Sequence, residues 1–508
     1  MRNAKKGILN SLYGVIGQLV LTAVAFFLPK LVIENYGSET NGLLHSTAQI
    51  ISYLSLFEAG VGAATIQALY SPVARNERER ISAIMSATDQ YYRKTGVIYA
   101  IGVVLIALIY PIAIHTELPY GLAMGVILFS GIGGCLSFFY QGKYMLLMRA
   151  EGYSYVIEKI DITTNIILNI VKFVLLKFST NVLIIQISIF LVSILKCVIY
   201  SAFIRKKYAW INLKAPPDNA AISQKNAVLV HQISSLVFSS TDVVLLTILL
   251  QDLKAVSVYT LYYAIVYAVY GVIQKLTAGF DFKLGQLYNT NKEKYCKAYH
   301  LVEMVDMISI FSTMSALYII LLPLISLYTR KITDTVYIIQ WLPLLFVTVP
   351  LLAHGRQATF STLAYSGHYK QTRKHTIIES IINIAVSIPC ILLIGIPGAL
   401  VGTIVATIYR TITAVNYSYK YLLSEGKEKT IKRWLLCITV FAVTVAVNYF
   451  VPLPYMDSFV LIGFVAVGFT IIFAMIYFIG QYIINKDERE TIKRIIKTRN
   501  IKSIFTEE

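Results

Sequence analysis

The chain has 508 residues, of which 56% are apolar and only 14% are charged. A soluble domain carries about 25% charged residues, so this composition excludes an ordinary water-soluble globule and predicts a chain that lies mostly in lipid. The formal net charge of +18 would fit a nucleic-acid binder among soluble proteins, but the positions of the charges give another explanation.

A helix that spans a bilayer needs about 20 mostly apolar residues, and fourteen segments meet this requirement. In chain order they are residues 8–33, 41–70, 95–115, 120–148, 156–177, 182–204, 227–250, 257–280, 304–328, 337–365, 376–395, 398–420, 434–452 and 458–484. The first follows a basic N-terminus but lacks a small-residue cleavage site, so we interpret it as a spanning helix and not as a signal peptide. The predicted fold class is an all-α polytopic membrane protein with about fourteen transmembrane helices.

Lysine and arginine gather in alternate loops. If the N-terminus is cytoplasmic, 35 of the 45 basic residues lie on the cytoplasmic side, five lie outside and five fall within helices. An excess of basic residues marks cytoplasmic loops, so both termini are predicted to be cytoplasmic. The asymmetry also accounts for the net charge without a nucleic-acid partner.

The chain contains an internal repeat. Leu69-Tyr70 recurs as Leu287-Tyr288, and Asn169-Ile170 recurs as Asn383-Ile384. Six helices separate the copies, and six is even, so the two bundles keep the same orientation and their pseudo-two-fold axis is predicted to follow the membrane normal. The predicted domains are an N-terminal six-helix bundle (1–210), a cytoplasmic linker (211–226), a C-terminal six-helix bundle (227–422), appended helices 13 and 14 (423–485) and a basic cytoplasmic tail (486–508).

The tail mixes isoleucine with basic residues. This spacing suits an amphipathic helix that lies on anionic lipid. A solvated basic tail fits the same residues, and the sequence leaves both interpretations open.

Charged residues at membrane depth cost about 2.5–3.5 kcal/mol each on insertion scales, so those present need an explanation. Several belong to polar stripes that repeat every three or four residues, which places them on one helix face. The stripes are Asp161, Asn165, Asn169 and Lys172; His231, Ser235, Ser239 and Asp242; Glu379, Asn383 and Ser387; and Thr403, Thr407, Arg410 and Thr411. We predict that these faces line a water-filled cavity between the bundles. The alternative, strongest for Asp161 and Glu379, is that the charges form bridges that only lock helices together.

Deep basic residues outnumber the deep acids. The acids are Glu58 and Asp242, and the basic candidates for substrate binding are Lys172, Lys196, Arg356 and Arg410. Lys275 is interpreted as a side chain that snorkels to the membrane surface. Arginine presents a fork that matches phosphate oxygens and lysine a point charge. The excess of positive charge therefore predicts an anionic substrate group such as pyrophosphate.

Nothing in the sequence indicates an enzyme. No Walker A sequence occurs, no metal-spaced histidine cluster is present, and the single helix histidines His231 and His354 are interpreted as packed side chains. The predicted outside loops have about ten residues or fewer, whereas a membrane polymerase or ligase would be expected to carry a larger one. The sequence predicts a transporter without a cofactor.

Several stretches, taken in order, resemble Wzx-type polysaccharide flippases of the multidrug/oligosaccharidyl-lipid/polysaccharide (MOP) exporter superfamily. They are Tyr36-Gly37 through Asn41-Gly42, Leu56 through Ala64, Ser240 through Leu245, Val258-Tyr259, Gly367 through Lys370, and Gly395 through Thr403. The resemblance covers almost the whole chain, although each motif alone is short.

The resemblance implies a V-shaped pair of bundles in the bacterial cytoplasmic (inner) membrane. It implies transfer of undecaprenyl-pyrophosphate-linked oligosaccharide repeat units from the inner to the outer leaflet for O-antigen or capsule, beside the polysaccharide polymerase machinery. The family's cationic lumen would fall to Lys172, Lys196, Arg356 and Arg410, lined by Asn165, Asn169, Glu379, Asn383 and Thr407. Coupling to a proton or sodium gradient would fall to Glu58 and Asp242.

Three rival functions remain at this point. A lipid II flippase shares the helix number and the cationic cavity. A cation-coupled multidrug exporter usually stops at twelve helices, and a basic cavity does not suit its cargo. A membrane glycan polymerase or ligase is the most distant alternative.

Overall fold

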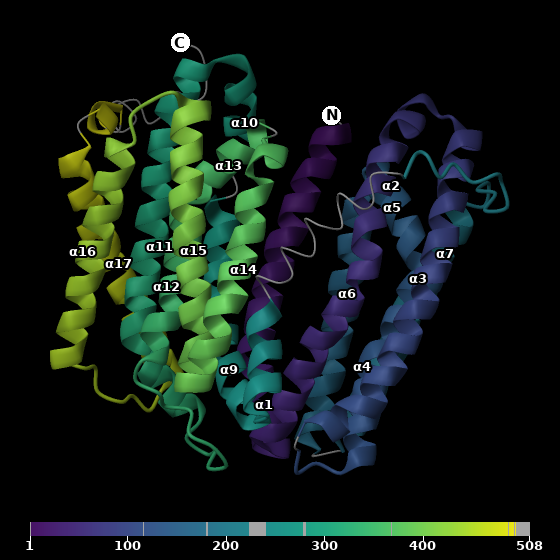
Figure 1. Ribbon diagram of the computed structural model, residues 1–508, viewed down its shortest axis with the longest axis horizontal. Coiled ribbons are helices and arrows are strands. Elements are labelled where there is room, and N and C mark those ends of the chain that lie inside the picture. Colours follow the sequence, from purple (N-terminus) through teal and green to yellow (C-terminus); the bar gives the residue numbers. More distant parts are fainter. Residues whose placement is uncertain are drawn as a thin grey trace. The chain divides into compact units, whose positions relative to one another are not determined.

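The computed structural model describes residues 2–114, 116–178, 181–222, 240–277, 281–366, 368–485, 487–491 and 493, with only the backbone described for residues 2–27 and a few others. Every regular element in these ranges is a helix (Figure 1). Nine of the described helices are long and apolar enough to cross a membrane, and Ser240–Leu250 and Leu342–Gly355 are shorter apolar helices. The predicted all-α polytopic membrane fold is confirmed, and the count of fourteen stays a prediction.

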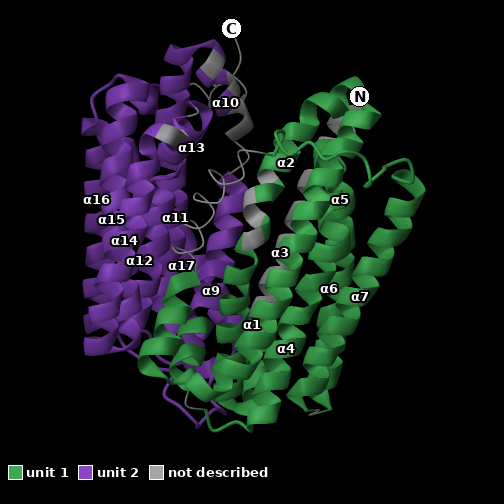
Figure 2. Cartoon of the chain, turned by 45° about the vertical axis from the view of Figure 1, so that its right-hand side comes forward, with its two compact units in different colours: residues 1–260 green, residues 261–508 purple. Residues whose placement is uncertain are grey.

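Contacts divide the chain into two units, Met1–Thr260 and Leu261–Glu508 (Figure 2). The first contains α1 (Arg2–Leu54), α2 (Leu56–Arg75), α3 (Arg78–Ala113), α4 (Tyr120–Leu136), the π-helical turn η1 (Ser137–Gln141), α5 (Gly142–Ala150), α6 (Ser154–Lys177), α7 (Val182–Lys207), Ser240–Leu250 and the start of α9 (Leu253–Thr277). The second contains the rest of α9, α10 (Asp281–Thr290), α11 (Lys292–Tyr328), α12 (Leu342–Gly355), α13 (Gln357–Ser366), α14 (Tyr369–Ile394), α15 (Ile396–Ser418), η3 (Tyr419–Leu423), α16 (Glu428–Phe450) and α17 (Phe459–Ile484).

The first unit extends beyond the predicted first bundle. Gly37 kinks α1 with φ 83° and ψ 167°, and in the helical segment that follows, Asn41 donates a hydrogen bond to Ser257 at 2.8 Å. At Gly42 an added Cβ would lie 1.8 Å from the carbonyl oxygen of Leu253. These short contacts hold the start of α9 against α1, so the division by contacts falls within α9, and the predicted bundle boundaries stay a prediction.

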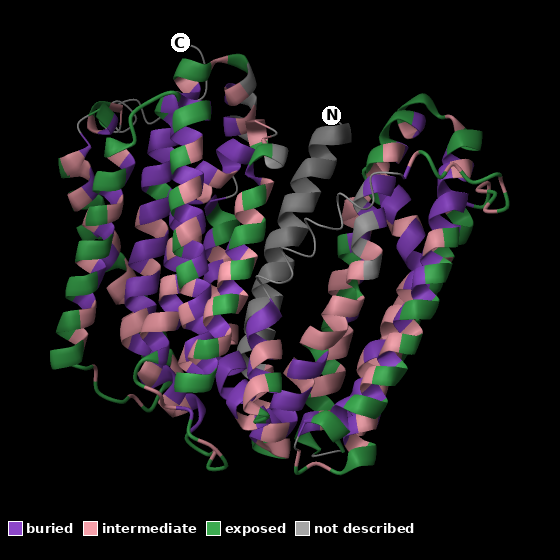
Figure 3. Cartoon of the chain, viewed as in Figure 1, coloured by how far each residue is buried: buried purple, intermediate pink, exposed green. Residues whose placement is uncertain are grey.

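The second unit is built around α11. This helix packs against α12, α16 and α17, and 67% of its most apolar span is buried, against 11% for α17. Figure 3 shows the same contrast, with buried residues along α11 and α12 and many exposed residues on α16. The appended helices are therefore a peripheral layer on α11.

Exposed apolar stripes indicate the lipid-facing surfaces. On α3, Ile101, Leu105 and Leu108 are exposed, while Tyr99 and Val103 of the same helix are buried. A spacing of three to four residues places each set on one helix face. Large exposed apolar surfaces are unusual in water, and here they fit a helix with one face in lipid.

Several helices are longer than the hydropathy pattern predicts. The span predicted at 95–115 begins at Arg78, and the one at 304–328 begins at Lys292. The added turns are rich in charge, so hydropathy assigns them to loops although they continue the helix. Two predicted spans are interrupted instead, 41–70 at Ser55 and 337–365 at Arg356.

The helix boundaries follow the predicted repeat. The offset in sequence between the starts of α3 and α11 equals the offset between the starts of α7 and α15. It is also the offset that relates Asn169 to Asn383. Three residues of the seventh-helix stripe, His231, Ser235 and Ser239, lie outside the described residues, as does most of the tail 486–508.

Candidate functional site

The site in the second unit depends on the close packing of α14 and α15. Gly395, with φ 67°, separates the two helices. An added Cβ would lie 2.2 Å from the Cys390 carbonyl carbon at Gly398, and 2.0 Å from Ser387 Oγ at Gly402. Only glycine permits this approach, which brings the polar stripes of the two helices into contact.

The polar stripes of α14 and α15 bond to each other. Asn383 Nδ2 donates to Thr403 Oγ1 at 2.9 Å, and Ser387 Oγ donates to the Ala399 carbonyl at 3.3 Å. Asn383 and Thr407 are fully buried. In the described structure Asn383 and Ser387 thus make helix–helix contacts, and a cavity lined by these stripes stays a prediction.

Glu379 holds two arginines at one end of these stripes. Its Oε1 lies 3.2 Å from Arg356 Nη2, and its Oε2 lies 3.5 Å from Arg410 Nε. Both guanidinium groups lie over the ring of Phe360, with Cζ 4.5 and 4.9 Å from its centroid. The three charged residues are at most 7% exposed, so this arginine–glutamate cluster is buried.

The two arginines differ in how many of their N–H donors make hydrogen bonds. Arg356 Nη1 also donates to the Thr407 carbonyl at 3.2 Å and to Thr411 Oγ1 at 3.4 Å. By contrast, Arg410 Nε and Nη1 have no hydrogen-bond partner within the described part of the chain. Two arginines against one glutamate give the cluster a formal charge of +1, and the unsatisfied donors belong to Arg410.

The two predicted cations of the first unit also differ in how fully a nearby carboxylate neutralises their charge. Lys196 Nζ on α7 lies 2.8 Å from Asp161 Oδ1 on α6, and both side chains are about 30% exposed. Lys172, also on α6, is half-buried, and no described carboxylate lies within ion-pair distance of it. On the same helix Asn165 is exposed and Asn169 half-buried. Lys172 is thus the less neutralised of the two lysines.

The two acids predicted for ion coupling are each bonded to tyrosine. Glu58 Oε1 on α2 accepts a hydrogen bond from Tyr92 at 3.0 Å. Asp242 Oδ2, in the helix Ser240–Leu250, accepts one from Tyr259 at 2.9 Å. Both pairs lie within the first unit, and their part in coupling stays a prediction.

The expected balance of four deep bases against two deep acids did not include the ion pairs that the structure shows. Asp161 and Glu379 are ion-paired with three of those bases, and two further basic residues, Lys143 and Arg433, are buried. Lys143 pairs with Asp89 and Arg433 with Glu303. Asp89 and Glu303 are related by the same offset as Asn169 and Asn383, and this equivalence in the repeat is the sequence signal that could have revealed these sites.

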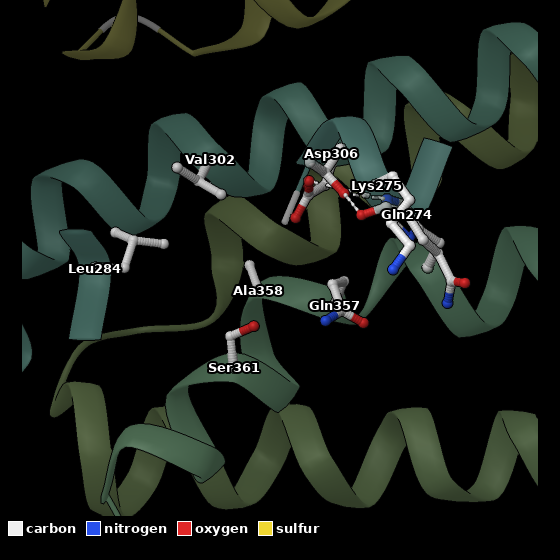
Figure 4. A pocket seen from close by; sticks show the side chains of 10 residues that line it. Gln274, Lys275, Leu284, Val302, Asp306, Gln357, Ala358 and Ser361 are labelled. Carbon is white, nitrogen blue, oxygen red and sulfur yellow. Dashed lines mark hydrogen bonds and ion pairs between the residues drawn. The ribbon is translucent and has the colours of Figure 1, made fainter. Parts of the chain in front are cut away.

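Sequence reasoning also missed Asp306 on α11. Its carboxylate lies 3.9 Å from the imidazole of His354, the histidine interpreted from sequence as a packed side chain. Both residues line a cavity of about 250 Å³ within the second unit (Figure 4). No group of three residues able to hold a metal ion is present among the described residues.

No family model and no curated protein matches the sequence. Among solved structures, an inward-facing multidrug resistance MATE family transporter of the MOP superfamily aligns with a TM-score of 0.66 at 14% identity, over 80% of this chain and 98% of its own. The lipid II flippase MurJ in an inward closed conformation aligns with a TM-score of 0.67 at 14% identity, over 92% and 98%. The chain shares its fold with these two transporters. At this identity the likeness concerns the fold, and the cargo has to be argued from the site.

Proposed function

We propose that the protein is a flippase that moves undecaprenyl-pyrophosphate-linked oligosaccharide repeat units from the inner to the outer leaflet of a bacterial cytoplasmic membrane. It works by alternating access of its two bundles, with both termini cytoplasmic and without a chemical step. The arginine–glutamate cluster is the main support: it carries a charge of +1, and Arg410 keeps two buried donors without a hydrogen-bond partner in the described chain.

The chemistry of Arg410 favours an anion. Each buried donor left unsatisfied costs about 1–3 kcal/mol, and a phosphate oxygen within reach would remove that penalty. A guanidinium matches phosphate geometry and stays charged at any physiological pH. The excess charge of the cluster would at the same time repel a cationic drug.

Lys172 is the corresponding candidate in the first unit. It lies one or two helical turns from Asn165 and Asn169 on α6, whereas the charge of Lys196 is offset by Asp161. A lysine that has no carboxylate partner among the described residues is the better ligand for a pyrophosphate. The four predicted cations thus separate into two stronger candidates, Lys172 and Arg410, and two that are ion-paired more fully, Lys196 and Arg356.

A lipid II flippase is the second candidate function. The alignment with MurJ, over 92% of this chain and 98% of its own, favours it. Lipid II carries the same polyprenyl pyrophosphate, so the two proposals share the phosphate site and differ in the sugars recognised. The MATE likeness keeps a multidrug exporter as a third candidate, which the charge of the cluster opposes.

The test is binding of purified protein in nanodiscs to a panel of an undecaprenyl-pyrophosphate oligosaccharide, lipid II and a lipophilic cation. We expect the oligosaccharide lipid to bind best. Arg410→Gln and Lys172→Gln should each weaken that binding about tenfold or more, the equivalent of one charged hydrogen bond. Lys196→Gln, the matched control, should change it much less. Preference for lipid II would favour the second candidate, and unchanged binding by a correctly inserted Arg410→Gln, Lys172→Gln double variant would exclude both proposed phosphate ligands.

A further inference from the structure

The second unit contains a polar cavity next to the arginine–glutamate cluster. Its volume is about 250 Å³, and since water occupies roughly 30 Å³ per molecule in the liquid, it has room for several waters. Figure 4 shows Asp306 of α11 near Gln274 and Lys275 of α9, with Gln357 and Ser361 of α13 also lining the space. The cavity can therefore hydrate a titrating group inside the membrane domain.

The titratable pair in this cavity is Asp306 and His354. Asp306 Oδ1 lies 3.9 Å from His354 Nε2, which is too long for a direct hydrogen bond but close enough for strong charge attraction. His354 is fully buried and Asp306 is 2% exposed. The Nε2 atom of His354 is also 3.4 Å from Thr277 Oγ1, and the Tyr270 ring meets the imidazole edge to face at 5.8 Å.

The surrounding charges permit a proton to bind and leave. Tyr270 and Lys275 face His354 from α9, Asp306 faces it from α11, and Arg356 follows it by two residues. Arg356 is offset by Glu379. Lys275, Asp306 and His354 together carry no net charge when the imidazole is neutral and +1 when it is protonated. Histidine is the side chain that ordinarily changes charge between about pH 5 and 8.

A helix junction connects this pair to the arginine–glutamate cluster. The helix α12 ends at Gly355, α13 begins at Gln357, and Arg356 between them has φ −95° and ψ 4°. At Gly355 an added Cβ would lie 2.6 Å from the indole of Trp434 on α16. Three consecutive residues, His354, Gly355 and Arg356, thus carry the titratable group, a tight packing contact and one arginine of the arginine–glutamate cluster.

We propose that the Asp306–His354 pair is a proton-binding site linked to anion binding at the arginine–glutamate cluster. The linkage rests on the proposed function, because it concerns the same cluster. Protonation of His354 adds a positive charge two residues from Arg356, which favours an anion at the cluster. Linkage is reciprocal, so a bound pyrophosphate also favours the proton.

The first test uses Trp434 as a reporter and needs no substrate. In a Trp210→Phe, Trp341→Phe background Trp434 is the only tryptophan, since the chain has three. Its fluorescence should titrate between about pH 5 and 8. The titration should disappear in His354→Gln, and its midpoint should fall in Asp306→Asn, which removes the negative charge beside the imidazole. His375→Gln, on α14, is the matched control and should leave it unchanged. An unaltered titration in both His354→Gln and Asp306→Asn would overturn the proton site.

The second test measures binding of inorganic pyrophosphate at pH 6 and pH 8. Because pyrophosphate itself titrates in this range, the ratio of the two affinities is compared between variants. The gain in affinity from pH 8 to pH 6 should be at least about fivefold larger in the parent than in His354→Gln, the lower end of typical coupling. Equal ratios would overturn the linkage. Absence of pyrophosphate binding at both pH values would reject the phosphate site and the linkage with it, while the fluorescence titration decides the proton site independently.

Discussion

Each unit carries an ion pair around an equivalent cation, but the surroundings of the two pairs differ. Lys196 and Arg410 are related by the offset of the repeat, so they hold equivalent places on α7 and α15, and each contacts an acid on the preceding helix. In the first unit the pair is about 30% exposed. In the second unit it is buried, and Arg356 adds a second base. The repeat therefore preserves the position of a cation, while its burial and its neighbours decide whether that cation is available to a ligand.

A second pair of equivalent positions differs in the origin of the partner. Asp89 on α3 and Glu303 on α11 are related by the same offset. Asp89 is neutralised by Lys143 of α5, within the six-helix repeat. Glu303 is neutralised by Arg433 of the appended α16, whose Nη1 lies 2.6 Å from Glu303 Oε2. The appended helices thus supply a charge that the second unit needs.

The largest effect is expected at Arg433. Its side chain is fully buried, and its Nη2 also contacts Glu488 at 2.9 Å, so Arg433→Met would leave two carboxylates buried with less compensation. Breaking a buried ion pair costs about 3–5 kcal/mol, and the upper end is expected here. Thermal unfolding in detergent measures the change. Lys143→Met is the comparison in the first unit; it should cost less, because Asp89 keeps Arg93 at 2.8 Å. Equal losses would contradict the difference between the units.

The next effect is expected for the acid of the repeated pair. Glu379→Gln leaves two buried arginines without their carboxylate and should cost about 3 kcal/mol. Asp161→Asn removes the acid from a partly exposed pair and should cost about 1 kcal/mol or less. Denaturation midpoints of the two variants test the ranking. A larger loss of stability in Asp161→Asn than in Glu379→Gln would contradict the conclusion that the ion pair of the second unit is the more deeply buried one.

The junction between α12 and α13 should be sensitive to one methyl group. Gly355→Ala places a Cβ against Trp434, and overpacking of this kind costs about 1–3 kcal/mol. Gly468→Ala on α17, where an added Cβ meets nothing within 4 Å, is the control and should be neutral or slightly stabilising, because alanine is the better helix former. Unchanged stability of Gly355→Ala would contradict this expectation and show that the junction accommodates the added methyl group.

The smallest effect is expected at the repeated asparagines. Asn383→Ala removes the bond to Thr403 within a buried contact and should cost about 1 kcal/mol. Asn169→Ala, its equivalent on the half-buried stripe of α6, should have an effect within about 0.5 kcal/mol. Thermal shifts of the two variants measure both effects. A clear loss of stability in Asn169→Ala would contradict the expectation that its half-buried side chain contributes little.

Hydropathy predicted the all-helical membrane fold because the requirement for long apolar segments is local in sequence. It placed the starts of α3 and α11 too late, since their first turns carry charges typical of loops. Asp89 and Glu303 belong to these helices, and Glu303 lies at the end of the turns that hydropathy omitted. Whether such a residue is paired depends on a partner 54 or 130 residues away.

The candidate site was predicted in part. Arg356, Arg410 and Glu379 stood out because charge within an apolar run is expensive, and the structure brings these three together. Pairing of Glu379 was one of two open alternatives, and its partners could not be predicted, because they depend on how α14 packs against α15 and against the junction of α12 and α13. The pair of His354 with Asp306 was missed for the same reason: a single histidine in a helix has no sequence pattern that points to its neighbour.

The glycines of the Gly395 to Thr403 stretch have a consequence for variation among relatives. Gly398 and Gly402 allow α14 and α15 to approach so closely that any side chain would collide with backbone or Ser387. Selection on these positions therefore acts on the crossing of two helices, whatever cargo is carried. Homologues should vary freely at Lys172 and Arg410 as cargo changes while keeping these glycines, so a search with this motif would gather transporters by architecture and a comparison of their buried cations would sort them by substrate.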